Sequence, residues 1–177
     1  MPGAKADKDS RGTAEVFGRL YEENLPKVFR YISYRVGNTQ LAEDLTSMVF
    51  EKALTRFNTY RSDRASFATW VLAIARNTVI DHHRTSISEQ TVALEMAAEI
   101  TAENVSPEEE AVRNDEQRRL QGYLLTLSEQ EQEILSLKFG AELTNRRIAQ
   151  MLGLSESNVG VMLYRAIRKL RDAFKEG

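Results

Sequence analysis

Polar side chains that can hydrogen-bond to base edges gather in the stretch Leu152–Leu170, near the end of the chain. Ser155 is a residue type that caps helices, so Glu156, Ser157 and Asn158 are expected in the first turn of the helix that follows. In DNA-binding proteins this first turn is the part that usually enters the major groove. The chemistry predicted here is noncovalent recognition of duplex DNA.

A helix-turn-helix is the element that would position these side chains, and its spacing is present. Thr144 can cap a first helix, in which Ala149 is the small residue needed where the second helix crosses. Four residues later Gly153 tolerates the positive φ that the turn requires, and six residues further Val159 supplies an apolar contact back to the first helix. The alternative interpretation of the same spacing is an ordinary helical hairpin.

The second helix carries few side chains that can distinguish one DNA sequence from another. Gly160 has no side chain, and either lets the backbone approach DNA closely or means that little is read there. Val161 and Tyr164 can touch a thymine methyl group but offer little polar discrimination. We therefore expect modest intrinsic affinity and a need for a second DNA contact elsewhere in the chain.

Composition predicts an all-α protein. Hydrophobic residues make up 42% and charged residues 28% of the 177 residues, with only nine Gly and three Pro, and apolar residues recur at helical spacing. There is no cysteine, which removes disulfides and thiolate metal sites. No apolar run approaches a membrane span or the core of a signal peptide, so we expect a cytoplasmic protein with no membrane partner.

The charges are segregated along the chain. Residues 13–84 carry ten Lys/Arg and eight Asp/Glu, residues 85–110 carry seven Glu and no basic residue, and residues 136–177 carry eight Lys/Arg and four Asp/Glu. Two mildly basic ends joined by an acidic middle suggest two modules that bind a polyanion, with a linker that avoids it.

The expected organisation is two small helical domains joined by that linker. Residues 1–12 read as a disordered tail, 13–84 as the first domain, 85–107 as the acidic linker and 108–177 as the second domain. In the first domain Pro26 is expected to start a new helix, Gly37-Asn38 to form a turn, and residues 58–66 to be a loop between helices over about 41–57 and 67–84. In the second domain Ser128 and Glu131 have the spacing of a capping box.

The motifs of both domains resemble those of one protein family. AEDLTSMVFEKAL (Ala42–Leu54) and FATWVLAIARNTVIDHHR (Phe67–Arg84) are similar to domain two of bacterial RNA polymerase sigma factors of the extracytoplasmic-function group, which have only domains two and four. The stretch from LSEQEQEILSLKF to the helix-turn-helix is similar to their domain four. The resemblance covers nearly the whole chain from Thr13, in the right order.

The resemblance implies that the chain directs promoter-specific transcription initiation. Its implied partners are core RNA polymerase, through the clamp helices of the largest subunit and the flap of the second-largest subunit, and promoter DNA, with an anti-sigma protein as a further candidate. Ala42–Leu54 would dock on the clamp helices, with Met48 and Phe50 as apolar anchors beside the acidic Glu43, Asp44 and Glu51. Alternatively, each of these carboxylates is simply part of a solvated helix face.

The resemblance also assigns the DNA contacts. The helix Phe67–Arg84 and the loop before it would bind the −10 element, through Asn58, Tyr60, Arg61, Ser62, Arg64, Arg76, Asn77 and Arg84. The loop would capture a base flipped out of the non-template strand, with the Tyr60 ring as a stacking surface. Asp81 is expected to orient Asn77 and Arg84, and Trp70 to belong to the core. The −35 contacts would be Ser157, Asn158, Gly160, Val161, Tyr164, Arg165 and Arg168. By the same resemblance, the acidic linker would thread the polymerase cleft.

Two other classes of function compete with this interpretation. A stand-alone helix-turn-helix regulator would share the C-terminal part but would have no need of Phe67–Arg84. The run Asp81-His82-His83 resembles a signature of metal-dependent phosphoesterases, but adjacent helical residues point about 100° apart, and the chain has only two histidines. We therefore expect no enzymatic activity, no cofactor and no metal ion.

Overall fold

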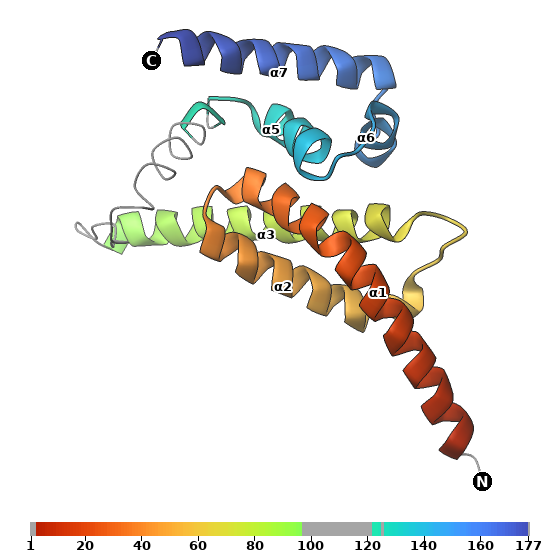
Figure 1. The fold of residues 1–177 in the computed structure, drawn as a ribbon. Coiled ribbons are helices and arrows are strands. Elements are labelled where there is room, and N and C mark those ends of the chain that lie inside the picture. Colours follow the sequence, from red (N-terminus) through yellow and green to blue (C-terminus); the bar gives the residue numbers. More distant parts are fainter. Residues whose placement is uncertain (1–2, 97–121, 125, 177) are drawn as a thin grey trace, which may run out of the picture.

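The structure is a computed structural model. It describes the backbone of residues 3–96, 122–124 and 126–176, and the side chains of residues 13–85, 122–124 and 126–175. Every regular element among these residues is helical, which confirms the predicted all-α class (Figure 1). None of the helices in the described part of the chain combines the length and apolarity that crossing a lipid bilayer requires.

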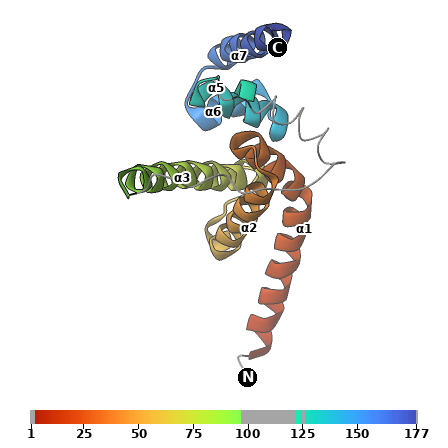
Figure 2. The same ribbon diagram turned by 90° about the vertical axis from the view of Figure 1, so that its left-hand side faces the viewer.

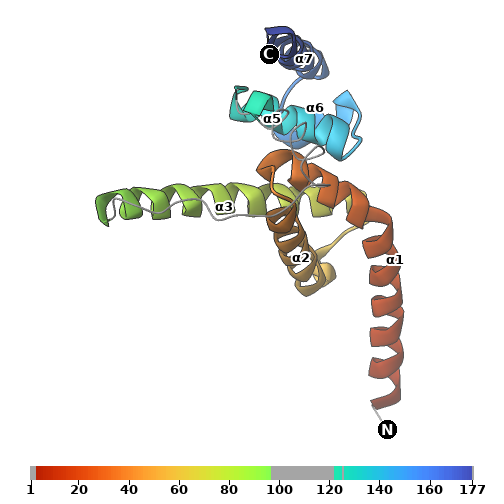
Figure 3. The same ribbon diagram turned by 60° about the vertical axis from the view of Figure 1, so that its left-hand side comes forward.

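Helix α1 (Gly3–Val36) is longer than the sequence indicated. It begins inside the stretch expected to be a tail, where Ala, Lys and Asp residues alternate in a helix-compatible sequence. Pro26 lies within the helix, so the expectation that it starts a new one is wrong. Its missing N–H removes one backbone hydrogen bond, but the burial of Val28, Tyr31 and Ile32 just after it holds the chain helical. The N-terminal part of α1 extends away from the other helices (Figures 1 and 3).

The predicted turn at Gly37-Asn38 is confirmed. Gly37 has φ +68°, a left-handed conformation that favours glycine. Asn38 caps helix α2 (Thr39–Thr55), because its side-chain oxygen accepts a hydrogen bond from the Leu41 N–H at 2.8 Å.

Helices α1, α2 and α3 (Phe67–Met96) form the N-terminal group. Their apolar stripes meet in one core in which Val28, Val49, Val71 and Leu72 are each 0% exposed. Helix α3 continues twelve residues past Arg84, into the stretch expected to be linker. The rest of the expected linker, residues 97–107, lies outside the described residues.

The C-terminal group consists of α5 (Glu129–Leu135), the π-helical turn η2 (Ser136–Gly140), α6 (Asn145–Leu152) and α7 (Glu156–Glu176). The helix-turn-helix is confirmed: Gly153 ends α6 with φ +69°, and Ala149 and Val159 are buried between α6 and α7. Thr144 caps α6 and Ser155 caps the start of α7, each accepting a backbone N–H.

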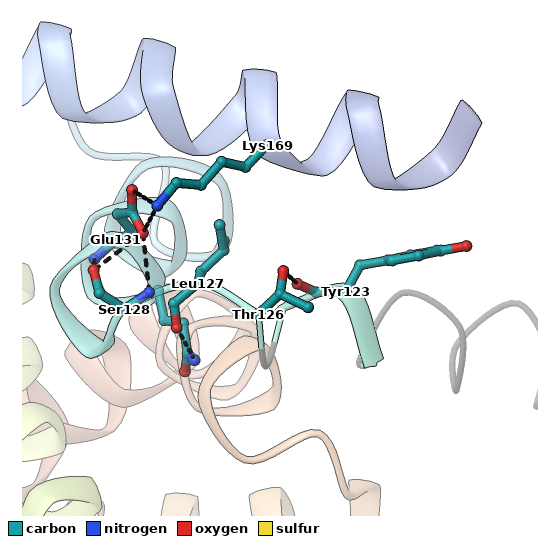
Figure 4. A network of polar contacts seen from close by, with 7 residues as sticks. Tyr123, Thr126, Leu127, Ser128, Glu131 and Lys169 are labelled. Atoms are coloured by element: carbon teal, nitrogen blue, oxygen red, sulfur yellow. Dashed lines mark hydrogen bonds and ion pairs between the residues drawn. The ribbon is translucent and has the colours of Figure 1, made fainter. Parts of the chain in front are cut away.

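The predicted capping box is also present and is tied to α7. Ser128 Oγ accepts a hydrogen bond from the Glu131 N–H, while Glu131 Oε2 accepts one from the Ser128 N–H. Lys169 on α7 donates to both carboxylate oxygens of Glu131, at 2.7 and 2.9 Å (Figure 4). This contact holds α7 against the start of α5.

The two groups of helices pack on each other in layers. Helix α7 is outermost, α5 and α6 lie beneath it, and α1, α2 and α3 lie on the other side of α5 (Figures 1 and 2). The contact between the groups is made mainly by α1 against η2, with a smaller contribution from α5. The residues predicted to bind DNA therefore lie on two groups of helices that contact each other.

Candidate nucleic-acid interface

A cationic cleft lies where the end of α2 meets the middle of α3. It has a volume of about 530 Å³, and its polar lining residues are Lys52, Arg56, Arg76, Asn77, Thr78, Asp81 and Arg84. Four cationic side chains and one carboxylate thus line the cleft, and this excess of positive charge suits a chain of phosphates. One of the four, Arg76, also places Nε 3.5 Å from Oε1 of Glu133 on α5. The structure brings the predicted Arg76, Asn77 and Arg84 together in this cleft.

Sequence reasoning missed the contribution of α2 to the cleft. Lys52 donates a hydrogen bond from Nζ to Thr78 Oγ1 on α3 at 3.1 Å, and the exposed Arg56, four residues later, is the C-cap residue that directly follows α2. Their i, i+4 spacing was a usable signal, but nothing in the sequence places this end of α2 beside α3.

Asp81 does not hold the two side chains that it was expected to orient. Within the described residues its carboxylate forms no ion pair with Arg84 and no hydrogen bond with Asn77, and its backbone carbonyl accepts from Thr85 Oγ1 at 3.0 Å. Asn77 and Arg84 are exposed and reach the cleft without it.

The predicted capture loop is anchored by aromatic rings. It opens with a short 3-10 turn, η1 (Phe57–Thr59), and the half-buried Tyr60 ring lies 6.0 Å from Phe57, 5.5 Å from Phe67 and 5.3 Å from Trp70, measured between ring centroids. Trp70 is itself half-buried against this cluster, as expected. Because protein rings already contact Tyr60, only the remainder of its surface is free to stack on a base.

The polar residues of the loop divide into two kinds. Arg61 donates to the backbone carbonyls of Asn58 at 3.1 Å and Tyr60 at 3.3 Å, so its guanidinium stabilises the loop itself. The side chains of Asn58, Ser62 and Arg64 are exposed and form no hydrogen bond or ion pair with other described residues.

The outer face of α2 presents most of the residues predicted to contact the polymerase. Glu43, Asp44 and Glu51 are exposed, and Met48 is 45% exposed. The prediction that Phe50 is an exposed docking anchor is wrong. Phe50 is 5% exposed, and its ring packs edge-on against Tyr21 with centroids 4.6 Å apart, so it is a core residue.

Leu54 is an exposed apolar residue that sequence reasoning missed. It is 57% exposed and lies eleven residues after Glu43, about three helical turns, so it extends the same outer face. An apolar pair of Met48 and Leu54 beside three carboxylates replaces the predicted pair of Met48 and Phe50.

The outer face of α7 presents the predicted −35 residues to solvent. Tyr164 is 62% and Val161 44% exposed, and Ser157, Asn158 and Arg165 are exposed with them. Arg168 is also exposed and lies 3.8 Å from Asp172, a loose surface pair that leaves the guanidinium accessible.

Gly160 is not a glycine for packing reasons. A Cβ built there would meet nothing closer than Asn145 Nδ2 at 3.9 Å, an ordinary van der Waals distance. The bare position therefore leaves the backbone of α7 open toward solvent, on the face that carries Val161 and Tyr164.

Comparison with known proteins matches both halves of the chain. Residues 20–86 match the family described as Sigma-70 region 2, and residues 117–170 match Sigma-70, region 4. The chain is 30% identical to the RNA polymerase sigma factor YlaC of Bacillus subtilis over 153 residues, which cover 86% of this chain and 88% of YlaC. It is 34% identical over 164 residues to the ECF RNA polymerase sigma factor BldN of Streptomyces coelicolor. The chain belongs to the extracytoplasmic-function group of sigma factors.

The relatives of this sigma factor differ in length. The match to BldN covers 93% of this chain but 62% of BldN, so the sigma factor spans less than two thirds of that relative. SigM of Bacillus subtilis is 26% identical over 158 residues, which cover 89% of this chain and 94% of SigM.

Two solved structures share the fold of this sigma factor. One is the sigma factor RpoE in complex with the anti-sigma factor NepR from Bartonella quintana, with a TM-score of 0.71, 18% identity, and coverage of 91% of this chain and 98% of that one. The other is CnrH in complex with the cytosolic domain of CnrY, with a TM-score of 0.71, 19% identity, and coverage of 97% and 95%.

Proposed function

We propose that this sigma factor binds core RNA polymerase and directs transcription initiation at promoters, reading the −10 element with α3 and its preceding loop and the −35 element with α7. The observation that carries the proposal is the pairing, in one chain, of a cationic cleft on Sigma-70 region 2 with an exposed helix-turn-helix on region 4.

The −10 surface suits a melted strand. Lys52, Arg56 and Arg84 can neutralise successive phosphates, and the exposed Asn77 amide has both a donor and an acceptor for a base edge. Beside the cleft, the loop residues Asn58, Ser62 and Arg64 are free to bind a base that has left the stack.

The −35 surface suits duplex DNA but discriminates weakly. Gly160, Val161 and Tyr164 supply close approach and apolar contact, while Arg165 and Arg168 supply charge to phosphates. Each of the two surfaces alone therefore binds DNA with modest affinity. Selectivity for a promoter requires a further protein that holds the two surfaces at a fixed separation.

Core polymerase is that further protein, and the outer face of α2 is the surface on which this chain would dock to it. Met48 and Leu54 provide exposed apolar anchors, and Glu43, Asp44 and Glu51 provide charge that steers a basic partner. The sequence match to Sigma-70 region 2 spans this helix.

The test is run-off transcription from genomic fragments with purified core polymerase, with and without this sigma factor. We expect discrete transcripts only when both are present, and their loss in a double variant, Asn77→Ala with Arg84→Gln. Arg19→Gln, which removes an exposed cation of α1 outside the cleft, is the matched control and should transcribe normally. Absence of any sigma-dependent transcript would refute the proposal.

The alternative, a stand-alone regulator, makes the opposite prediction about duplex DNA. A mobility shift at physiological salt distinguishes the two functions, since a regulator binds its site tightly without polymerase. We expect a specific shift only when core polymerase is added.

An anti-sigma partner stays a prediction. RpoE and CnrH, which share the fold, were each solved with a protein partner, NepR for RpoE and the cytosolic domain of CnrY for CnrH. Inhibition of run-off transcription by a co-expressed protein that binds this chain stoichiometrically would establish such a partner.

A further inference from the structure

Gly160 lies at the centre of the face of α7 that is proposed to contact the −35 element. The residues of this face follow one another at helical spacing and so share one side of the helix: Ser157, Gly160, Val161 and Tyr164. Val161 and Tyr164 are 44% and 62% exposed, and neither carries a charge that could hold a phosphate. The missing side chain at Gly160 opens this face toward the group that lies beside it.

That group belongs to the other helix of the helix-turn-helix. The nearest atom that a Cβ on Gly160 would meet is Nδ2 of Asn145, at 3.9 Å. Asn145 is the half-buried first residue of α6, which packs against α7 (Figure 1). Because glycine has no side chain, the amide of Asn145 is left uncovered on the side of the −35 face.

Lys138 determines which end of the Asn145 amide is available. Its Nζ donates a hydrogen bond to Asn145 Oδ1 at 3.0 Å. A lysine ammonium group carries only donors, so it selects the oxygen of the amide and leaves the NH2 group on the other side. Within the described residues Asn145 Nδ2 donates no hydrogen bond to the protein. Its N–H groups are therefore free for an acceptor that approaches over Gly160.

The charges near this donor favour an anionic acceptor. The Lys138 ammonium group lies 3.0 Å from the other end of the amide, and the exposed Arg146 directly follows Asn145. In duplex DNA the anionic acceptors are the phosphate oxygens. The first helix of a helix-turn-helix crosses the DNA backbone while the second enters the major groove. An amide of α6 at the edge of the −35 face of α7 is thus placed to meet a phosphate.

We propose that Asn145 donates a hydrogen bond to a backbone phosphate of the −35 element, and that Gly160 is bare so that this phosphate can reach the amide. Lys138 is then a positioning residue, because it holds the amide with its NH2 group toward the DNA. This inference rests on the proposed function, which assigns this face of α7 to the −35 element.

The first test is promoter binding by the complex of this sigma factor with core polymerase. Competition against a labelled promoter fragment, found by run-off transcription, gives the affinity. Asn145→Ala should bind this fragment about tenfold more weakly, the effect of losing one hydrogen bond to a charged group. An unchanged affinity would refute the contact.

The positioning role of Lys138 is tested by two substitutions. Lys138→Met cannot hold the Asn145 amide and should weaken promoter binding, whereas Lys138→Arg can still donate to Oδ1 and should restore most of the affinity. Lys175→Met is the matched control, because it removes an exposed cation at the far end of α7 and should bind normally. An equal loss in Lys138→Met and Lys175→Met would mean that only net charge matters.

Gly160→Ala separates binding from stability. The methyl group would lie against the Asn145 amide and hinder the phosphate, so promoter binding should weaken. Alanine is favoured over glycine inside a helix, so the same variant should unfold at a higher temperature. In the Asn145→Ala background, Gly160→Ala should leave the affinity unchanged, because the donor that it covers is already gone. Fully additive losses would refute the role given to Gly160.

Two changes to the DNA locate the contact. On a promoter fragment that begins downstream of the −35 element, Asn145→Ala and the unsubstituted chain should bind equally. When single phosphates of the −35 element are replaced by uncharged methylphosphonates, one position should be found at which Asn145→Ala causes no further loss.

Each failure has a distinct signature. If Asn145→Ala loses as much affinity on the shortened fragment, the substitution acts through the fold or through polymerase binding, and the contact is refuted. If its effect persists at every methylphosphonate position, the acceptor is not a phosphate and the proposal fails. In both cases the sigma activity stands. If the unsubstituted chain neither binds polymerase nor initiates, the proposed function fails first.

Discussion

Lys169 on α7 contacts both carboxylate oxygens of Glu131, at 2.7 and 2.9 Å, and Glu131 in turn completes the capping box of α5. One side chain therefore supports two structural features, the start of α5 and the orientation of α7 (Figure 4). Variants at Glu131 can separate these two contributions.

Glu131→Ala removes both features and is expected to lower the free energy of unfolding by about 2 kcal/mol. Glu131→Gln keeps a residue that can complete the capping box but loses the charge opposite Lys169, so about half of that loss is expected. Thermal or urea unfolding of the two variants checks the ratio. Equal losses in both would contradict the division.

Acidification should weaken the same contact. Burial acts to raise the pKa of Glu131, but hydrogen bonds from Lys169 and Ser128 outweigh it and hold the pKa below its ordinary 4.5. Folding thus favours the carboxylate, so its contribution is fully present above pH 4.5 and is lost as the pH falls through the lower folded-state pKa. The unfolding midpoint of Glu131→Gln should approach that of the unsubstituted chain as the pH is lowered in this window. A constant difference would exclude the linkage.

Truncation of Phe50 should lower stability, whereas truncation of Met48 should lower the affinity for core polymerase. Phe50→Ala empties a site in the core and is expected to cost about 3–5 kcal/mol of stability. Met48→Ala, at a 45% exposed position, should leave stability nearly unchanged but weaken binding to core polymerase. Chemical denaturation and a polymerase-binding titration measure the two effects. Full core affinity in Met48→Ala combined with Leu54→Ala would remove α2 from the docking surface.

Lys52 and Arg84 should each account for about one phosphate contact. In complex with core polymerase, Lys52→Gln and Arg84→Gln are expected to reduce the slope of log affinity for single-stranded DNA against log salt by about 0.7 units each. Fluorescence anisotropy gives these slopes, with a labelled single-stranded oligonucleotide that carries the non-template −10 sequence of a promoter found by run-off transcription, at several salt concentrations. Arg19→Gln is the control, and a slope change of the same size there would indicate nonspecific electrostatics.

Gly160→Ala should stabilise α7. The position has room for a methyl group, and alanine is favoured over glycine inside a helix by about 1 kcal/mol. Unfolding experiments test this gain. A loss of stability would mean that the bare position is required by the fold.

Local chemistry made the helix-turn-helix predictable. Ala149, Gly153 and Val159 each satisfy a requirement of backbone geometry or close packing that few residue types meet. The capping box at Ser128 was predictable for the same reason, because its two hydrogen bonds are formed within one turn. In contrast, the side chain of Phe50 is buried by Tyr21, a residue of another helix that local spacing does not reveal.

The errors at element ends have the same origin. Pro26 ends or kinks a helix in isolation, but tertiary burial of Tyr31 and Ile32 overrides that local preference. The arrangement of the two halves was also beyond the sequence, because Glu133 pairs with Tyr31, 102 positions earlier in the chain, and a carboxylate near a helix start usually indicates solvent exposure. The role of Lys52 in the cleft was also missed, because it depends on a contact with Thr78 of another helix.

Tyr31 is 0% exposed and is covered from the far half of the molecule by Glu133 and Gly140. Detachment of that half would bring an aromatic ring and its apolar surroundings into contact with water, a condition that promotes aggregation and degradation. The contact made by Glu133 and Gly140 therefore also keeps this apolar surface out of water, and variants that weaken the contact are expected to aggregate more readily.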